Sequence, residues 1–165
     1  MNRPLDPGDP DRFRAVRLLD VLIPTRNRPA ELAVTLAGLG GNDVPGTDTF
    51  GVVVSDQSDG DPPWTQPAVA AAVRVLRHRG RPVLLTRHLP RRGLAEQRAF
   101  LLDQSAARYV LYLDDDVWLE PGALARMLAA IEELGCGFVG NAVHGLSYID
   151  DVRAETHRHY RSEEH

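Results

Sequence analysis

The chain has 165 residues, a formal net charge of -4, 43% hydrophobic residues and one cysteine. This size fits one domain with a real hydrophobic core, and the mild negative charge argues against a general nucleic-acid-binding surface. The single Cys136 excludes an internal disulfide. Because no stretch resembles a signal peptide or reaches the length of a membrane span, we expect a cytoplasmic protein without a transmembrane segment.

Short apolar runs alternate with amphipathic stretches along most of the chain. The predicted strands are residues 18–23, 50–54, 82–86, 109–113 and 137–144, and the predicted helices are residues 68–79, 91–105, 121–134 and a helix that starts near Pro29. This alternation indicates an α/β fold with a mostly parallel sheet flanked by helices. The expected parts are a flexible N-terminal arm over residues 1–17, one domain over 18–145 and a charged, His-rich tail over 146–165.

The most informative stretch is a triplet of carboxylates, Asp114, Asp115 and Asp116, which follows the predicted strand 109–113 directly. Like charges this close repel, and each loses hydration near a core, so a hard divalent cation is the usual compensation. In an open α/β sheet, the carboxyl end of a strand is where ligands bind. Aspartate runs also occur in solvated turns, so the triplet alone leaves a metal role and a turn role about equally open.

Three further motifs stand at strand ends or helix starts. The first strand ends in Pro24-Thr-Arg-Asn-Arg28, the second ends in Ser55-Asp56-Gln-Ser58, and a helix entered by Gly93 carries Arg98. Together with the triplet, and in this order, they resemble the Pro-Thr-x-Asn-Arg, Asp-Asp-x-Ser, Ala-Arg-Asn and Asp-x-Asp motifs of family 2 glycosyltransferases. The resemblance covers about residues 18 to 145. It implies a GT-A (Rossmann-like) nucleotide-sugar-binding domain, with a sheet that is incomplete at its C-terminus.

The resemblance also assigns the triplet. Asp116 is the first choice as a ligand of Mg²⁺ or Mn²⁺, because glycosyl transfer expels a diphosphate whose growing charge a divalent cation stabilises. Asp114 is expected at the ribose or at a metal-bound water, which places it with Asp116 in the metal site. Asp115 could do either. The family's catalytic base lies on a later segment, so the catalytic residue stays unknown and we expect this chain to be truncated before it.

The remaining expected donor-site residues come from the other motifs. Pro24, Thr25, Arg26 and Arg28 would line the nucleotide, although both arginines could instead be surface charges. Asp56 is expected to accept the imide N–H of uracil or thymine, with a turn-capping aspartate as the alternative.

The last motif adds two residues to the expected donor site. Gly93 would enter the helix that brings Arg98 to the diphosphate, which a guanidinium can bind through two parallel hydrogen bonds. The alternative for Arg98 is a surface pair with Asp103 or Glu96.

The sequence therefore predicts a metal-dependent and inverting glycosyltransferase. Its donor would be a nucleotide diphosphate sugar, expected to be UDP-linked, and its acceptor is an unknown glycan, lipid or small molecule. The alternative is a nucleotide-sugar-binding module without turnover alone. A nucleotidyltransferase or an NAD-binding domain requires a glycine-rich phosphate loop after the first strand. Residues 24–29 contain no glycine, which argues against both classes. An incomplete sheet would leave an edge that favours pairing with a second copy.

Overall fold

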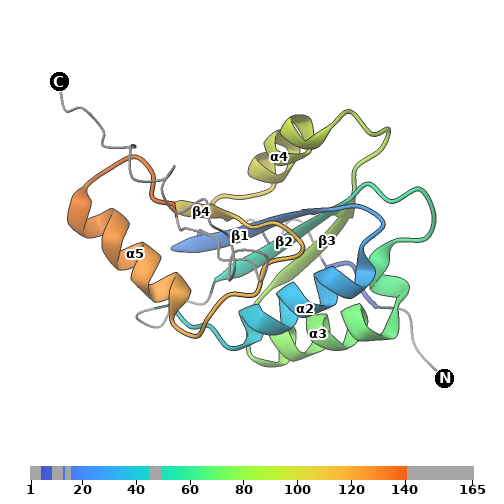
Figure 1. Ribbon diagram of the computed structural model, residues 1–165, viewed down its shortest axis with the longest axis horizontal. Coiled ribbons are helices and arrows are strands. Elements are labelled where there is room, and N and C mark those ends of the chain that lie inside the picture. Colours follow the sequence, from blue (N-terminus) through green and yellow to red (C-terminus); the bar gives the residue numbers. More distant parts are fainter. Residues whose placement is uncertain (1–4, 9–12, 14–15, 45–49, 141–165) are drawn as a thin grey trace, which may run out of the picture.

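The computed structural model describes residues 5–8, 13, 16–44 and 50–140. Its strands are β1 (Leu19–Thr25), β2 (Gly51–Asp56), β3 (Val83–Arg87) and β4 (Tyr109–Tyr112). Its helices are α2 (Pro29–Gly40), α3 (Pro67–His78), α4 (Leu94–Asp103), α5 (Ala123–Leu134) and the short 3-10 helix η1 (Pro63–Thr65). The four strands form one parallel sheet in the order β3-β2-β1-β4, which confirms the predicted α/β class (Figure 1).

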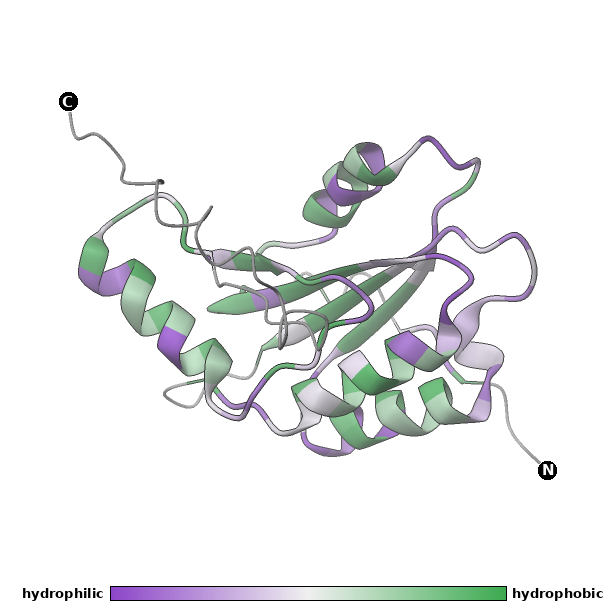
Figure 2. Cartoon of the chain, viewed as in Figure 1, coloured by the Kyte–Doolittle hydropathy of each residue, from purple (hydrophilic) through white to green (hydrophobic). Residues whose placement is uncertain are grey.

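Helices cover both faces of this sheet. Helices α2 and α3 lie against one face and α4 against the other (Figure 1). On the first face, α5 joins the same core through Leu124 and Leu128. On the second, Leu101 of α4 packs with Leu22 and Val53. A parallel sheet buried on both faces needs strands that are apolar almost throughout, and Figure 2 shows this hydrophobic character along the strands.

The strand register brings the carboxyl ends of the inner strands together. Thr25 at the end of β1 is paired with Asp56 at the end of β2, and Asp56 in turn is paired with Arg87 of β3. Polar loops leave the sheet at this edge (Figure 2). The sequence motifs that follow β1 and β2 therefore meet at one place.

Several predicted boundaries differ from the observed ones. The predicted strand 137–144 is wrong over residues 137–140, which are not in a strand, and residues 141–144 lie outside the described residues. Helix α5 begins at Ala123 and not at Pro121, because Gly122 has a positive φ of 78° and interrupts the helical backbone. Helix α4 likewise begins after Gly93, three residues later than predicted, and η1 was not predicted.

The described parts of the N-terminal arm have defined contacts, unlike the flexible arm expected over residues 1–17. Leu85 of β3 donates its backbone N–H to Pro7 O at 2.8 Å, and Arg77 donates to Asp6 O at 2.7 Å. Phe13 is buried in the core beside α4. The expected tail over 146–165 lies outside the described residues. Within the described ranges, no helix is long and apolar enough to cross a membrane, and the cytoplasmic location stays a prediction.

Candidate functional site

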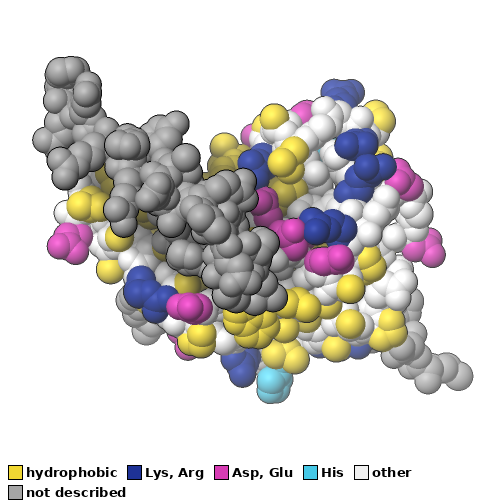
Figure 3. Space-filling model, viewed as in Figure 1, with side chains coloured by type: hydrophobic (Ala, Val, Ile, Leu, Met, Phe, Trp, Pro, Cys, Tyr) yellow, Lys and Arg dark blue, Asp and Glu magenta, His cyan; other side chains and the backbone are white. Residues whose placement is uncertain are grey.

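A cavity of about 340 Å³ opens at the carboxyl edge of the sheet. Four segments meet there: the end of β1, the end of β2, the start of α4 and the loop after β4. The lining residues are Pro24, Thr25, Arg26, Arg28, Gln57, Arg91, Leu94, Gln97, Asp114, Asp115 and Asp116. Figure 3 shows acidic and basic side chains side by side on this face of the molecule. Seven of the expected donor-site and metal-site residues thus share one cavity.

The triplet reaches this cavity directly after β4. Leu113 is buried and donates its backbone N–H to Leu22 O at 3.0 Å, which continues the pairing with β1 by one residue. The chain then turns at Asp115 and Asp116. Asp115 is buried like Leu113, whereas Asp114 and Asp116 are exposed.

Asp115 is the enclosed carboxylate of the three, with a side chain only 7% exposed. Thr25 Oγ1 donates a hydrogen bond to its Oδ2 at 2.7 Å, and Arg28 donates to its Oδ1 at 3.2 Å. Burial raises the pKa of Asp115, and the charge of Asp116 adds to this effect, while Thr25 and Arg28 oppose it. Both oxygens of this carboxylate therefore already have a donor from β1 or the loop after it.

The two exposed carboxylates are also paired with arginines. Arg28 donates its second amino group to Asp116 Oδ2 at 2.9 Å, so its guanidinium spans two carboxylates of the triplet. The charges of Asp115 and Asp116 raise the pKa of Arg28. Arg98 donates to Asp114 Oδ1 at 2.9 Å. The observed partner of Arg98 is therefore Asp114, and not Asp103 or Glu96 as in the alternative given by the sequence.

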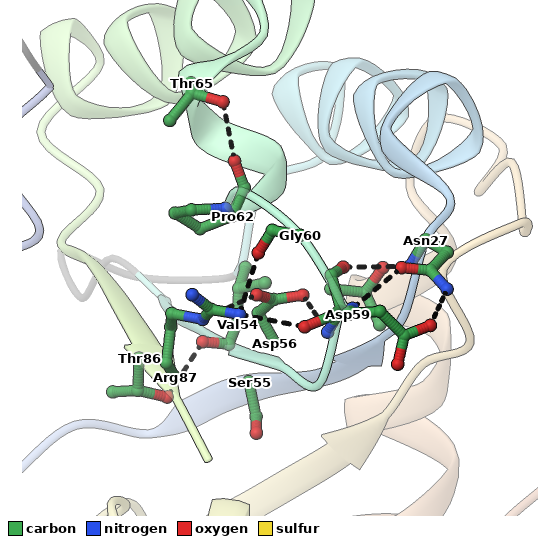
Figure 4. A network of polar contacts seen from close by, with 12 residues as sticks. Asn27, Val54, Ser55, Asp56, Asp59, Gly60, Pro62, Thr65, Thr86 and Arg87 are labelled. Carbon is green, nitrogen blue, oxygen red and sulfur yellow. Dashed lines mark hydrogen bonds and ion pairs between the residues drawn. The ribbon is translucent and has the colours of Figure 1, made fainter. Parts of the chain in front are cut away.

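The loop after β1 is fixed by the loop after β2 (Figure 4). Asn27 has a φ of 55°, in the left-handed region that asparagine tolerates better than most residues. Its backbone N–H donates to Ser58 Oγ at 2.8 Å, and its side chain exchanges hydrogen bonds of 2.6 and 3.0 Å with Asp59. Arg26 donates to the same carboxylate at 2.9 Å. These bonds hold the turn that directs Arg28 toward the triplet.

Asp56 is placed differently from the expected donor-site residue. Its carboxylate is fully buried, accepts the Ser58 N–H at 2.8 Å and lies 3.3 Å from Arg87 Nε (Figure 4). It does not line the cavity. A base-reading role would require this carboxylate to separate from Arg87. The hydrogen bond from Ser58 and the ion pair with Arg87 fit the alternative of a turn-capping aspartate.

Gly93 and Arg98 also lie outside the cavity lining, although Gly93 starts α4 as expected, with a φ of 108°. Gln57 and Gln97 also line the cavity and were not predicted as site residues. Gln97 is buried and donates to Ser55 O at 2.7 Å, which ties α4 to the end of β2. Gln57 follows Asp56 and Gln97 precedes Arg98 in the sequence. Their positions next to these motif residues could have indicated a place in the site.

The donor set fits a divalent cation that is shared with a ligand. Among the residues that the structure describes, no three His, Cys, Asp or Glu side chains are grouped as a metal cage. Asp115 and Asp116 do supply hard oxygens on the wall of a cavity. Mg²⁺ in nucleotide-binding enzymes is usually held by one or two carboxylates, with phosphate oxygens and water as the remaining ligands. The triplet is compatible with that arrangement and not with an all-protein site.

Comparison with known families decides the class of this protein. The family described as glycosyl transferase family 2 matches residues 20–163. The chain belongs to glycosyl transferase family 2. The match covers most of the chain and contains every motif on which the sequence resemblance rested. No curated protein matches the chain.

Solved structures support the GT-A type of α/β fold. The chain is 24% identical to S. aureus TarS 1–349, with a TM-score of 0.57 over 77% of this chain and 38% of that one. It is also 24% identical to the mannosyltransferase PcManGT from Pyrobaculum calidifontis in complex with GDP-Man and Mn²⁺, with a TM-score of 0.56 over 75% of this chain and 34% of that one. The chain thus spans well under two thirds of either protein, and at this identity the likeness concerns the fold alone.

Proposed function

We propose that this glycosyltransferase family 2 domain binds a nucleotide diphosphate sugar in the cavity beside the triplet, together with Mg²⁺ or Mn²⁺. One observation carries the proposal: three carboxylates and the arginines Arg26, Arg28 and Arg91 line the same cavity at the carboxyl edge of the sheet. Carboxylates alone would suit a cation, and arginines alone would suit a phosphate. Both together suit a diphosphate that arrives with a cation.

Each group in the cavity has a separate task in this proposal. Asp116 and Asp114 would ligate the cation, and Asp115 would position the triplet through its bond to Thr25. When bound, the cation supplies Lewis-acid stabilisation of the charge that grows on the leaving diphosphate. Arg28 would donate to phosphate oxygens from the β1 side of the cavity, and Arg91 lines the cavity from the segment before α4.

The donor is proposed to be UDP-linked, as the sequence resemblance implies. A GDP-linked donor is the competing choice, because the neighbour PcManGT is recorded with GDP-Man and Mn²⁺. Asp56 remains the proposed reader of a uracil imide only if its carboxylate leaves Arg87 in the complex. Direct comparison of UDP with GDP therefore tests the base preference without assuming it.

Transfer is proposed to invert the anomeric centre by direct displacement, with a general base taking the proton of the acceptor hydroxyl. Within the described residues, the triplet provides the only carboxylates of the cavity lining. No described side chain is therefore assigned as the base, and the acceptor, whether glycan, lipid or small molecule, stays open. This observation favours nucleotide-sugar binding without turnover by this chain alone as the second candidate.

The first experiment is calorimetric titration of UDP and GDP into the protein, with and without Mn²⁺. We expect binding that requires Mn²⁺, and a loss of at least about tenfold in Asp116→Ala, in the range seen when groups around a metal are removed. Glu120→Ala is the matched control, because Glu120 is an exposed carboxylate on the same loop, does not line the cavity and pairs with Arg126. Equal metal-independent binding by all three proteins, or no binding by a folded wild type, would overturn the proposal.

A release assay separates the two candidate functions. A glycosyltransferase should produce UDP or GDP from the matching nucleotide sugar, slowly with water and faster with an acceptor. A binding module should bind the same nucleotide sugar and release no diphosphate over the same period. The Asp116→Ala variant should abolish both the binding and the release if the cation site is the one proposed.

A further inference from the structure

Arg28 occupies the position at the triplet where a cation would bind. Its two terminal nitrogens contact Asp115 Oδ1 at 3.2 Å and Asp116 Oδ2 at 2.9 Å. Thr25 holds the other oxygen of Asp115. A divalent cation that bound to Asp116 would face a guanidinium already bonded to that carboxylate, and charges of the same sign repel at this range.

The exposure of the partners indicates which of them moves. The Asp115 side chain is 7% exposed and is fixed by Thr25, whereas the Arg28 side chain is 47% exposed. An exposed arginine can leave a salt bridge at little cost, because water replaces the lost contacts. The charge of Glu31, three residues further along the chain, also favours the charged guanidinium.

We propose that Arg28 is a built-in counter-cation of the triplet, which exchanges with the divalent cation when the donor binds. The inference rests on the proposed function. In the donor-free protein Arg28 neutralises Asp115 and Asp116. In the complex it leaves them and donates to the phosphate oxygens that arrive with the cation. Arg28 would thereby couple the binding of the cation to the binding of the diphosphate.

This exchange predicts a specific order of affinities. A free cation must displace Arg28 without offering it a new partner, so Mn²⁺ alone should bind weakly. With a diphosphate present, the displaced guanidinium gains phosphate oxygens, so each ligand should strengthen the binding of the other by the same factor. Removal of the guanidinium should strengthen binding of Mn²⁺ alone and weaken this mutual effect.

The test measures Mn²⁺ affinity of the full chain by electron paramagnetic resonance, first without nucleotide and then with saturating UDP. We expect Arg28→Gln to bind Mn²⁺ alone about tenfold more tightly than the wild type, and to lose most of the gain that UDP produces, a range typical of coupled sites. Arg28→Lys keeps the charge and should stay closer to the wild type. Arg126→Gln is the control for net charge, because Arg126 pairs with Glu120 and does not line the cavity.

The outcomes distinguish this inference from the function on which it rests. Mn²⁺ that binds with UDP but shows the same affinity in wild type and Arg28→Gln would overturn the exchange alone. A similar gain in Arg126→Gln would also overturn it, because the effect would then be one of net charge. Absence of Mn²⁺ binding in every protein, with and without UDP or GDP, would overturn the metal-dependent function and the exchange together. Circular dichroism checks that each variant is folded.

Discussion

The two ends of β1 carry two arginine–aspartate clusters that differ in their surroundings. At the amino end, Arg17 donates to Asp20 at 2.9 Å and Ser105 donates to the same carboxylate at 2.7 Å. The Asp20 side chain is 0% exposed and Arg17 only 10%. At the carboxyl end, Arg28 spans Asp115 and Asp116 at the wall of an open cavity. The same pair of residue types is sealed in one place and accessible in the other.

The difference teaches how to separate a structural charge pair from a functional one. In the amino-end cluster, protein groups supply donors to both oxygens of the carboxylate, which is fully buried. The absence of a side chain at Gly51 provides the space for this cluster, because a Cβ there would overlap Asp20 Oδ1 and Arg17 Nε. In the carboxyl-end cluster, the guanidinium is half exposed and free to exchange partners. Burial of the charged partners, and not the presence of the pair, decides the role.

The largest expected effect is loss of stability at the amino end. Asp20→Ala should lower the free energy of unfolding by about 3–5 kcal/mol, because it leaves Arg17 buried without its counter-charge. Urea unfolding followed by circular dichroism measures this change. Glu120→Ala, which breaks an exposed pair with Arg126, should cost less than about 1 kcal/mol. Similar losses in both variants would show that burial does not decide how much such an ion pair contributes to stability.

A smaller loss is expected for Thr25→Val, which removes the hydroxyl that donates to Asp115 Oδ2. We expect a cost of about 1–3 kcal/mol at neutral pH, since a buried acceptor loses its donor. Burial already raises the pKa of Asp115, so the ionised carboxylate opposes folding above that pKa, and the protonated form does not below it. The cost of Thr25→Val should therefore shrink as the pH falls through the pKa of Asp115. A cost that stays constant with pH in urea unfolding would contradict this assignment.

Asp116→Ala should leave stability almost unchanged, within about 1 kcal/mol, because its pair with Arg28 is exposed. The same variant should lose Mn²⁺-dependent nucleotide binding. This combination sets it apart from Asp20→Ala, which is expected to lose stability. Urea unfolding and calorimetry on the same preparation measure both properties. A large loss of stability in Asp116→Ala would assign the triplet a structural role instead.

The sequence predicts the fold well because hydrophobic runs report burial directly. Residues 19–25 and 51–56 are buried throughout as two parallel strands, close to their predicted limits. The helix boundaries were less predictable, because the positive φ of Gly122 decides where α5 begins. The strand expected over 137–144 rested on a short apolar run alone. Such a run has no periodicity that distinguishes a strand from an extended loop.

The site was predictable in outline and not in its pairings. The triplet and Arg28 line one cavity, and their roles toward a donor and a cation stay predictions. Asp56 does not, because a strand-end side chain can point to either side and Arg87 on the next strand attracts it. The sequence cannot show that Arg28 meets the triplet, since 87 residues separate it from Asp115. Contacts between distant residues depend on strand order, which the motifs alone do not fix.

The smallest expected effect concerns the contact between Asn27 and Asp59, which joins the two loops after β1 and β2. The hydrogen bond from Asn27, and then that from Arg26, lowers the pKa of Asp59 below its usual value. A lowered pKa in the folded state stabilises the protein above the pKa of the unfolded chain, and this contribution is lost as the pH falls through the folded pKa. Asp59 is exposed, so the change in stability should be slight. Titration of its carboxyl carbon by NMR should show the low pKa, and Asn27→Ala should raise it toward the usual range. If the pKa of Asp59 is the same in wild type and variant, the side chain of Asn27 is not what lowers it, and the link between the loops rests on Arg26 and on the backbone bond to Ser58.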